Sequence, residues 1–317
     1  MMIALAASAA AVENLQPNGT VWAVNRRRLR QLRRLAPSAK VIGGTEAEPY
    51  EFPFNAALLV TSRIPSGSTP NVKNAQDCGA SLLDPTDLHQ GNNQVLWALT
   101  AGHCCKKRST PDQWSLLVHG HNLRRTGAHP CTEIIPVAET IRHPDYDNRL
   151  TKHDVCLLKM SREPTCGQQL KNDGLLMTLG EEMPKAGFVG TLTGWGTTTV
   201  SENKYPNALQ EVSLKLKKQR FCKKKAGQGD IQGMICTFMK GGQQGGCSGD
   251  SGSPYFYRAG GKFVQIGINS WGAGKCAKKP EFYASVPAYR DWIKANVPLE
   301  GRVWPPNRLF GGTASFG

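Results

Sequence analysis

Cys247-Ser248-Gly249-Asp250-Ser251-Gly252-Ser253-Pro254 is the stretch that decides how this chain is interpreted. A serine hydroxyl is almost fully protonated at neutral pH, so it needs a neighbouring base and donors directed at the oxyanion that it creates. Glycines on both sides of Ser251 allow a sharp turn that aims the N–H groups of Gly249 and Ser251 at one point. The stretch therefore predicts a nucleophilic serine with an oxyanion hole.

A matching base and a matching acid stand upstream of this serine. The base candidate is His103, within TAGHC, and the acid candidate is Asp154, within HDVCLL. They are 51 residues apart, and Asp154 lies 97 residues before Ser251. His, Asp, Ser is one of several unrelated chain orders that build the same geometry. The three residues are therefore the candidate catalytic triad.

These motifs resemble those of the trypsin/chymotrypsin-like serine peptidases, in which they read TAAHC, DIxL and GDSGGP. Here they read TAGHC, DVCL and GDSGSP. Four more motifs resemble family sequences in the same order: VIGG (41–44), TGWG (193–196), SWG (270–272) and AYRDWI (288–293). The resemblance covers about residues 41–297. It implies an all-β fold of two six-stranded antiparallel Greek-key barrels, with the active site in the cleft between them and a short C-terminal helix.

The composition agrees with a β-rich secreted protein. The 317 residues include 34 glycines and 20 prolines, and short apolar runs such as VLWAL (95–99) are typical of strands. Ten cysteines indicate an oxidising compartment, so we expect secretion. After the N-terminus no apolar run of 18 residues follows, so no membrane span is expected.

Four segments are expected along the chain. Residues 1–12 are apolar and alanine-rich like a signal peptide, although they lack its positive start. Residues 13–40 are basic and without periodicity, which is typical of a pro-peptide. The peptidase domain is expected over 41–297, followed by a tail, 298–317, that extends past the usual end of the family.

The resemblance also assigns roles to the site residues. His103 would take the proton of Ser251 and return it to the leaving amine, while Asp154 orients the imidazole. Ser270 would support Asp154, and Gly249 and Ser251 would donate to the oxyanion, where one donor is worth about 3 kcal/mol of barrier. Trp271 and Gly272 continue the strand that pairs with the substrate backbone.

Activation is expected to depend on cleavage after Lys40. The new α-amine of Val41 would insert and pair with the Asp250 carboxylate, which orders the oxyanion loop. A buried carboxylate without a partner is costly, so the uncut chain would be a latent precursor. The alternative is a chain that is active without cleavage.

The resemblance implies three disulfides: Cys78–Cys104, Cys222–Cys236 and Cys247–Cys276. The four other cysteines allow three pairings, between which the sequence does not choose. Cys156, in the strand after Asp154, is equally compatible with a free buried thiol. The four residues are Cys105, Cys131, Cys156 and Cys166.

The specificity pocket departs from that of trypsin-like enzymes. The position of the usual acid, six residues before Ser251, is Gly245, followed by Gly246. Gly272 should leave the pocket mouth open. Glu281 stands where the family has a glycine. Its carboxylate would lie on a different wall of the pocket from the usual acid, and there it would favour a basic residue before the scissile bond. Two alternatives are a pocket partly filled by Glu281 that takes apolar residues, and a Glu281 turned outward to Lys278 or Lys279.

The charge of the chain is unusually positive. The net charge is +15, of which residues 1–40 contribute +6, leaving +9 on the mature part. Seven of the basic residues lie between positions 215 and 225, and a basic patch of this kind attracts polyanions. Sulfated glycans or acidic proteins are the candidate partners, and an ordinary solvated surface is the alternative. No nucleic-acid recognition motif accompanies the charge. The seven basic residues are Lys215, Lys217, Lys218, Arg220, Lys223, Lys224 and Lys225.

We therefore predict a secreted serine endopeptidase made as a zymogen. Its partners would be protein or peptide substrates and protein inhibitors. No cofactor and no metal are expected, because the stretch matching the family's calcium loop, residues 120–125, is basic. A chymotrypsin-like preference is one rival. An inactive family member that works as a polyanion-binding module is the other, although intact His103, Asp154 and Ser251 disfavour it.

Overall fold

A computed structural model describes residues 42–89, 93–106, 110–149, 151–199, 204–227, 231–239, 241 and 244–297. The chain divides into two units, Met1–Ser38 and Ala39–Gly317, and every described residue belongs to the second. The expected signal peptide, pro-peptide, Lys40, Val41 and C-terminal tail lie outside the described residues. In the described part, no helix is both long and apolar enough to span a membrane.

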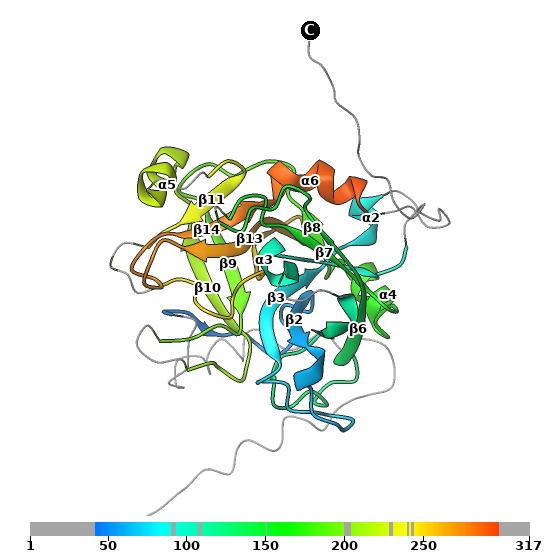
Figure 1. The fold of residues 1–317 in the computed structure, drawn as a ribbon. Helices are drawn as coiled ribbons and strands as arrows, with labels where there is room; N and C mark the ends of the chain where they lie inside the picture. The colour runs from blue at the N-terminus through cyan, green and yellow to red at the C-terminus, as the bar shows by residue number, and fades with distance from the viewer. Residues whose placement is uncertain are drawn as a thin grey trace, which may run out of the picture. The chain divides into compact units, whose positions relative to one another are not determined.

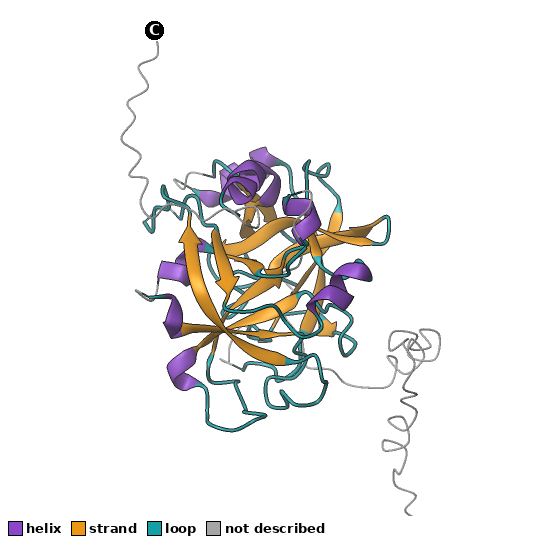
Figure 2. Cartoon of the chain, turned by 90° about the vertical axis from the view of Figure 1, so that its right-hand side faces the viewer, coloured by secondary structure: helices purple, strands orange, loops and turns teal. Residues whose placement is uncertain are grey.

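The chain folds mainly into strands, with short helices around them (Figures 1 and 2). The strands are β1 (Thr45–Glu46), β2 (Asn55–Val60), β3 (Gln76–Leu82), β4 (Trp97–Thr100), β5 (Trp114–Val118), β6 (Glu133–Arg142), β7 (Cys156–Met160), β8 (Met177–Leu179), β9 (Val189–Gly194), β10 (Gln210–Lys215), β11 (Met234–Thr237), β12 (Pro254–Ala259), β13 (Lys262–Gly272) and β14 (Glu281–Ser285). The helices are α2 (Pro85–Leu88), α3 (Gly102–Lys106), α4 (Gly167–Asn172), α5 (Gln219–Ala226) and α6 (Val286–Ala295), with 3-10 turns η1 (Thr61–Arg63) and η2 (Pro111–Gln113).

The first half is a closed barrel in the order β2-β3-β4-β7-β6-β5. Every pair in it is antiparallel. The strands β2 and β5 read NAALLV and WSLLV and are buried throughout. Continuous burial, rather than alternation, is what a strand enclosed on both faces requires. This half is the six-stranded antiparallel barrel that the sequence predicts.

The second half is a curled sheet of eight strands, in the order β1-β10-β9-β12-β13-β14-β11 with β8 beside β13. Its six longer strands pair antiparallel, and among the described residues an isolated bridge between Leu216 and Thr237 joins the two edges of the sheet. Two short strands extend it, and β8 runs parallel to β13. The prediction of an all-β fold in two halves with a short C-terminal helix is confirmed, whereas the second barrel is more open than expected.

Aromatic packing joins the two halves. Phe54, directly before β2, lies 5.0 Å from Phe256 and 4.7 Å from Phe263, measured between ring centroids. Ser81 of β3 also donates to the Gln265 side chain, at 2.7 Å. Phe54 and Gln265 are fully buried, so this contact excludes water and holds the halves in one arrangement.

Candidate active site

Three separate segments carry the predicted triad. His103 lies in α3, directly after β4, and Asp154 lies two residues before β7. Because Leu99 and Thr100 of β4 pair with Leu157 and Cys156 of β7, the segments that carry His103 and Asp154 meet at the same end of the barrel. Ser251 lies in the turn before β12, in the second half. The site is therefore composed from both halves of the fold.

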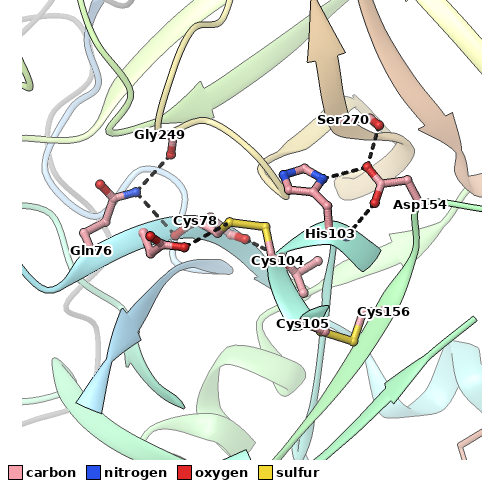
Figure 3. The surroundings of a disulfide bond; sticks show 12 residues. Gln76, Cys78, His103, Cys104, Cys105, Asp154, Cys156, Gly249 and Ser270 are labelled. Carbon is pink, nitrogen blue, oxygen red and sulfur yellow. Dashed lines mark hydrogen bonds and ion pairs between the residues drawn. A yellow bond between two sulfur atoms is a disulfide. The ribbon is translucent and has the colours of Figure 1, made fainter. Parts of the chain in front are cut away.

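The Asp154 carboxylate is fully buried and accepts three hydrogen bonds. The donors are the backbone N–H of His103 at 2.7 Å, the Nδ1 of His103 at 2.8 Å and the Ser270 hydroxyl at 2.5 Å (Figure 3). A carboxylate only accepts, so Nδ1 carries the hydrogen and a neutral imidazole leaves Nε2 as its acceptor nitrogen. This arrangement holds a base ready on His103.

The turn around Ser251, in the second half, is held by hydrogen bonds from β3 of the first half. The carbonyl of Ser251 accepts from Gly79 N at 2.7 Å, and the carbonyl of Gly249 accepts from the Gln76 side chain at 2.9 Å (Figure 3). Gly249 has φ 96°, in the region that favours glycine. Among the described residues, the N–H groups of Gly249 and Ser251 have no acceptor. Two such donors in one fixed turn suit an oxyanion.

Asp250, between these two residues, points into the protein. Its carboxylate is fully buried and accepts from Gly196 N at 2.8 Å and Cys247 N at 2.9 Å. Burial, together with a smaller contribution from the nearby charge of Glu281, raises the pKa of Asp250 to about 7. A Cβ on Gly196 would collide with this carboxylate, so the glycine is needed for its approach.

The segment after Val41 lies beside the same loop. The carbonyl of Ile42 accepts from Gly245 N at 3.0 Å, and the carbonyl of Gly43 accepts from the Gln244 side chain at 3.1 Å. Residues 42 and 43 are therefore hydrogen-bonded to the loop that leads into the Ser251 turn.

A pocket of about 240 Å³ adjoins Ser251. Gly245, predicted as a pocket residue, is not among the residues that line this cavity, and it packs against Ala277, whose backbone a Cβ at residue 245 would meet at 3.1 Å. The pocket is lined by Gly246, Cys247, Ser248, Ser251, Asn269, Ser270, Trp271, Gly272, Gly274, Lys275, Cys276, Ala277, Lys279, Pro280 and Glu281.

Glu281 contributes its carboxylate to this pocket. The carboxylate accepts from Gly246 N at 2.7 Å, from Asn269 Nδ2 at 3.1 Å and from the Tyr283 hydroxyl at 3.1 Å. Burial raises the pKa of Glu281 above its ordinary value. Among the described residues it forms no ion pair with Lys278 or Lys279, so the outward alternative is not the arrangement found.

Sequence reasoning missed two of these partners, Asn269 and Tyr283. Tyr283 lies two residues after Glu281 on β14, so both side chains face the same side of the sheet. Asn269 is opposite Tyr283 in the pairing of β13 with β14. The two-residue spacing of Glu281 and Tyr283 can be seen in the sequence and places both side chains on one face of a strand. The pairing of β14 with β13, which brings Asn269 to them, cannot be seen there.

Five disulfides form among the described residues. The three pairs implied by resemblance, Cys78–Cys104, Cys222–Cys236 and Cys247–Cys276, are those formed in the structure. The four other cysteines form Cys105–Cys156 and Cys131–Cys166. Cys156 is therefore not a free thiol. Its bond joins the residue two after His103 to the residue two after Asp154, and so it links the two segments that carry them (Figure 3).

Two groups of side chains have metal-ligand types within 4.8 Å of one another, in the described part of the chain. One contains His103 with Cys78 and Cys104, and the other contains Cys131 with two histidines. All three cysteines are in disulfides, so none offers a thiolate. Neither group is a ligand set for a structural zinc ion.

Comparisons with known proteins agree with this geometry. The trypsin family model matches residues 41–293. The chain belongs to the trypsin family.

Individual relatives of this trypsin-family chain are moderately similar. It is 30% identical to kallikrein-8 of Homo sapiens over 84% of the chain and 90% of the relative. It is 30% identical to trypsin-1 of Astacus astacus over 81% of the chain and the whole relative. Among solved structures, neuropsin, a serine protease expressed in the limbic system of mouse brain, matches with a TM-score of 0.63 and 28% identity, over 80% of this chain and 97% of that one. The protein is a serine-type endopeptidase of trypsin-like fold.

Proposed function

We propose that this trypsin-family protein cleaves peptide bonds through an acyl-enzyme on Ser251. The Oγ of Ser251 attacks the scissile carbonyl carbon while Nε2 of His103 takes its proton. The C–N bond then breaks as His103 gives that proton to the leaving amine, and water releases the acyl group by the same route. The observation that carries the proposal is the buried Asp154 carboxylate, which holds His103 in the required tautomer with Ser270 as its third donor.

We further propose that the N–H groups of Gly249 and Ser251 bind the oxyanion, and that cleavage after Lys40 completes this arrangement. The ammonium of Val41 would pair with Asp250. The support is physical: a fully buried carboxylate with two N–H donors and a raised pKa is stabilised by a cation. The neighbouring residues Ile42 and Gly43 already lie against residues 244 and 245.

Glu281 is our candidate for the primary specificity determinant. Its carboxylate lines the pocket beside Ser251, and three donors hold it there. An Arg or Lys side chain entering the pocket would meet this charge, so basic residues before the scissile bond are preferred. Apolar preference is the alternative.

Secretion and the remaining partners follow from the same features. Five disulfides among the described residues favour an oxidising, extracellular environment. Substrates would be proteins or peptides, protein inhibitors would bind the same cleft, and the seven basic residues between Lys215 and Lys225 would bind a polyanion.

The precursor cleaved after Lys40 is expected to hydrolyse peptides ending in Arg or Lys faster than matched peptides ending in Phe, Leu or Ala. Glu281→Gly should lower kcat/KM for Arg and Lys by about 2 kcal/mol, roughly 30-fold, with a smaller effect on Leu. Glu281→Gln is the isosteric control for charge. N-terminal sequencing verifies the cut at Val41.

A preference for Phe or Leu would refute the role of Glu281 and leave the peptidase proposal intact. Full activity of the uncut chain would refute the activation proposal. Absence of turnover on every peptide, with no difference from Ser251→Ala, would favour a binding module.

The preference for Arg over Leu is also expected to rise with pH. Burial raises the pKa of Glu281 above 4.5, so the carboxyl stays protonated to higher pH than an exposed glutamate and attracts a cation weakly there. The ratio of kcat/KM for Arg and Leu peptides should therefore still increase with pH above the range in which an exposed glutamate titrates, about pH 4.3. Ionisation of any group that acts on both substrates alike cancels in the ratio. Glu281→Gln should make the ratio independent of pH; the same slope in that variant would refute the assignment.

A further inference from the structure

Seven cations form one exposed group on the second half of the fold, which we call the basic cluster: Lys215, Lys217, Lys218, Arg220, Lys223, Lys224 and Lys225. They lie on the end of β10, on the link after it and on α5, which Figure 1 shows beside β11. All are exposed except Lys217, which is half-buried. Among the described residues none of the seven has an ion pair, so the cluster carries its full charge into solvent.

The positive charges at the start of α5 are unfavourable for the helix, whereas Lys223, Lys224 and Lys225 lie in its last turn, where the helix dipole favours them. The helix reads QRFCKKKA, with no acidic residue in its first turn. Lys218 is its N-cap and offers no side-chain hydrogen bond, while Lys217, Lys218 and Arg220 place positive charge at the positive end of the helix dipole. The backbone N–H groups of Gln219 and Arg220 have no acceptor among the described residues. An anion at this end would relieve the repulsion and satisfy these donors.

The surface under the cations is rigid. The Cys222–Cys236 disulfide ties α5 to β11, and Cys222 is fully buried. The rings of Phe221 and Phe238 stack, with centroids 5.9 Å apart. The ammonium of Lys217 lies 5.7 Å and 5.8 Å from the two centroids, and that of Lys225 lies 5.9 Å from Phe221. The rings and the disulfide therefore hold several cations in fixed positions, which lowers the entropy cost of binding a ligand.

We propose that the basic cluster is a binding site for a sulfated polysaccharide. This deepens the polyanion partner proposed above and rests on that proposal, but it is independent of the catalytic site. A sulfated chain carries dense permanent charge and no apolar surface, and it needs a surface of the same kind. In the described part of the chain, Val189 is the exposed large hydrophobic residue, and it lies at the edge of the cluster, opposite Lys215 in the pairing of β9 with β10. A single valine is smaller than the aromatic anchors of protein interfaces. The cluster thus lacks the apolar anchor of a typical protein interface.

Nucleic acid fits the cluster less well than a sulfated glycan does. Binding of single strands uses exposed aromatic rings on which bases stack. Phe221 is half-buried and covered by Lys217 and Lys225. The cluster offers point charges, which suit sulfate groups along a flexible chain.

The test measures binding of the full chain to heparin as a function of NaCl concentration. The variant Lys218→Gln, Arg220→Gln, Lys224→Gln removes three exposed cations. The matched control Arg124→Gln, Arg125→Gln, Lys262→Gln removes three exposed cations elsewhere. At about 0.15 M NaCl the cluster variant should bind at least about tenfold more weakly, and the slope of log Kd against log [NaCl] should fall by about two to three. The control should stay close to the original chain.

Three results would overturn the proposal. The first is equal weakening by the control variant, which would mean that only net charge matters. The second is equal binding of unsulfated hyaluronan, and the third is tighter binding of polyglutamate or single-stranded DNA than of heparin. The basic residues of 1–40 are the same in all chains, so they cancel in the comparison. Samples of each chain are also cleaved after Lys40, and their hydrolysis of peptides reports on the active site separately. Loss of glycan binding and loss of catalysis are thereby distinguished.

Discussion

Replacement of Ser251 by alanine is expected to lower kcat of the cleaved enzyme by about a millionfold. The reason is that the proposed reaction requires a covalent bond to Oγ, which no neighbouring group can supply. Ser251 lies at the mouth of the pocket, in a turn held through Gly79 and Asn269. Loss of one small hydroxyl should leave that turn intact. Hydrolysis of an Arg peptide, followed over hours at high enzyme concentration, measures the residual rate.

Two controls make the Ser251→Ala result specific. Ser213→Ala removes an exposed hydroxyl on β10 and should leave the rate unchanged. His103→Ala added to Ser251→Ala should cost little more, because residues that act as one unit are strongly non-additive. A Ser251→Ala enzyme that keeps more than about 1% of the rate, after contaminating peptidases are excluded, would contradict the serine mechanism.

Replacement of Asp154 by asparagine is expected to lower kcat by about ten thousandfold. The amide keeps the size of the side chain but replaces one accepting oxygen by a donor. The carboxylate accepts from the backbone and Nδ1 of His103 and from Ser270, so one of these contacts must be lost. If His103 presents a hydrogen on Nε2 in response, it has no lone pair with which to accept the proton of Ser251.

Ser270→Ala is the graded comparison for Asp154→Asn. This variant removes the Ser270 hydroxyl, a neutral donor, and keeps the negative charge of Asp154, so we expect kcat to decrease by about tenfold. Thermal unfolding of both variants checks that the buried site still folds. An Asp154→Asn enzyme within tenfold of the original would mean that the orientation of His103 does not depend on this carboxylate.

The motifs were sufficient to predict the all-β class, the C-terminal helix, the peptidase class and the three candidate triad residues. Short motifs carry this information because the chemistry restricts the residue types: a nucleophilic serine requires a base, an acid and glycines at particular positions. The resemblance to the family also implied three of the five disulfides. The second half was less predictable, since the bridge between Leu216 and Thr237 and the parallel pairing of β8 depend on how the sheet curls.

The sequence by itself determined which chemical groups are present and their order, because motifs record local requirements. The tertiary structure alone decided which distant groups meet. It paired Cys105 with Cys156, packed Gly245 against Ala277, and brought Asn269 and Tyr283 to the Glu281 carboxylate. Each of these contacts depends on the register between strands and on the packing of side chains around them. A local sequence pattern contains no record of the partner strand, so only the folded chain settles them.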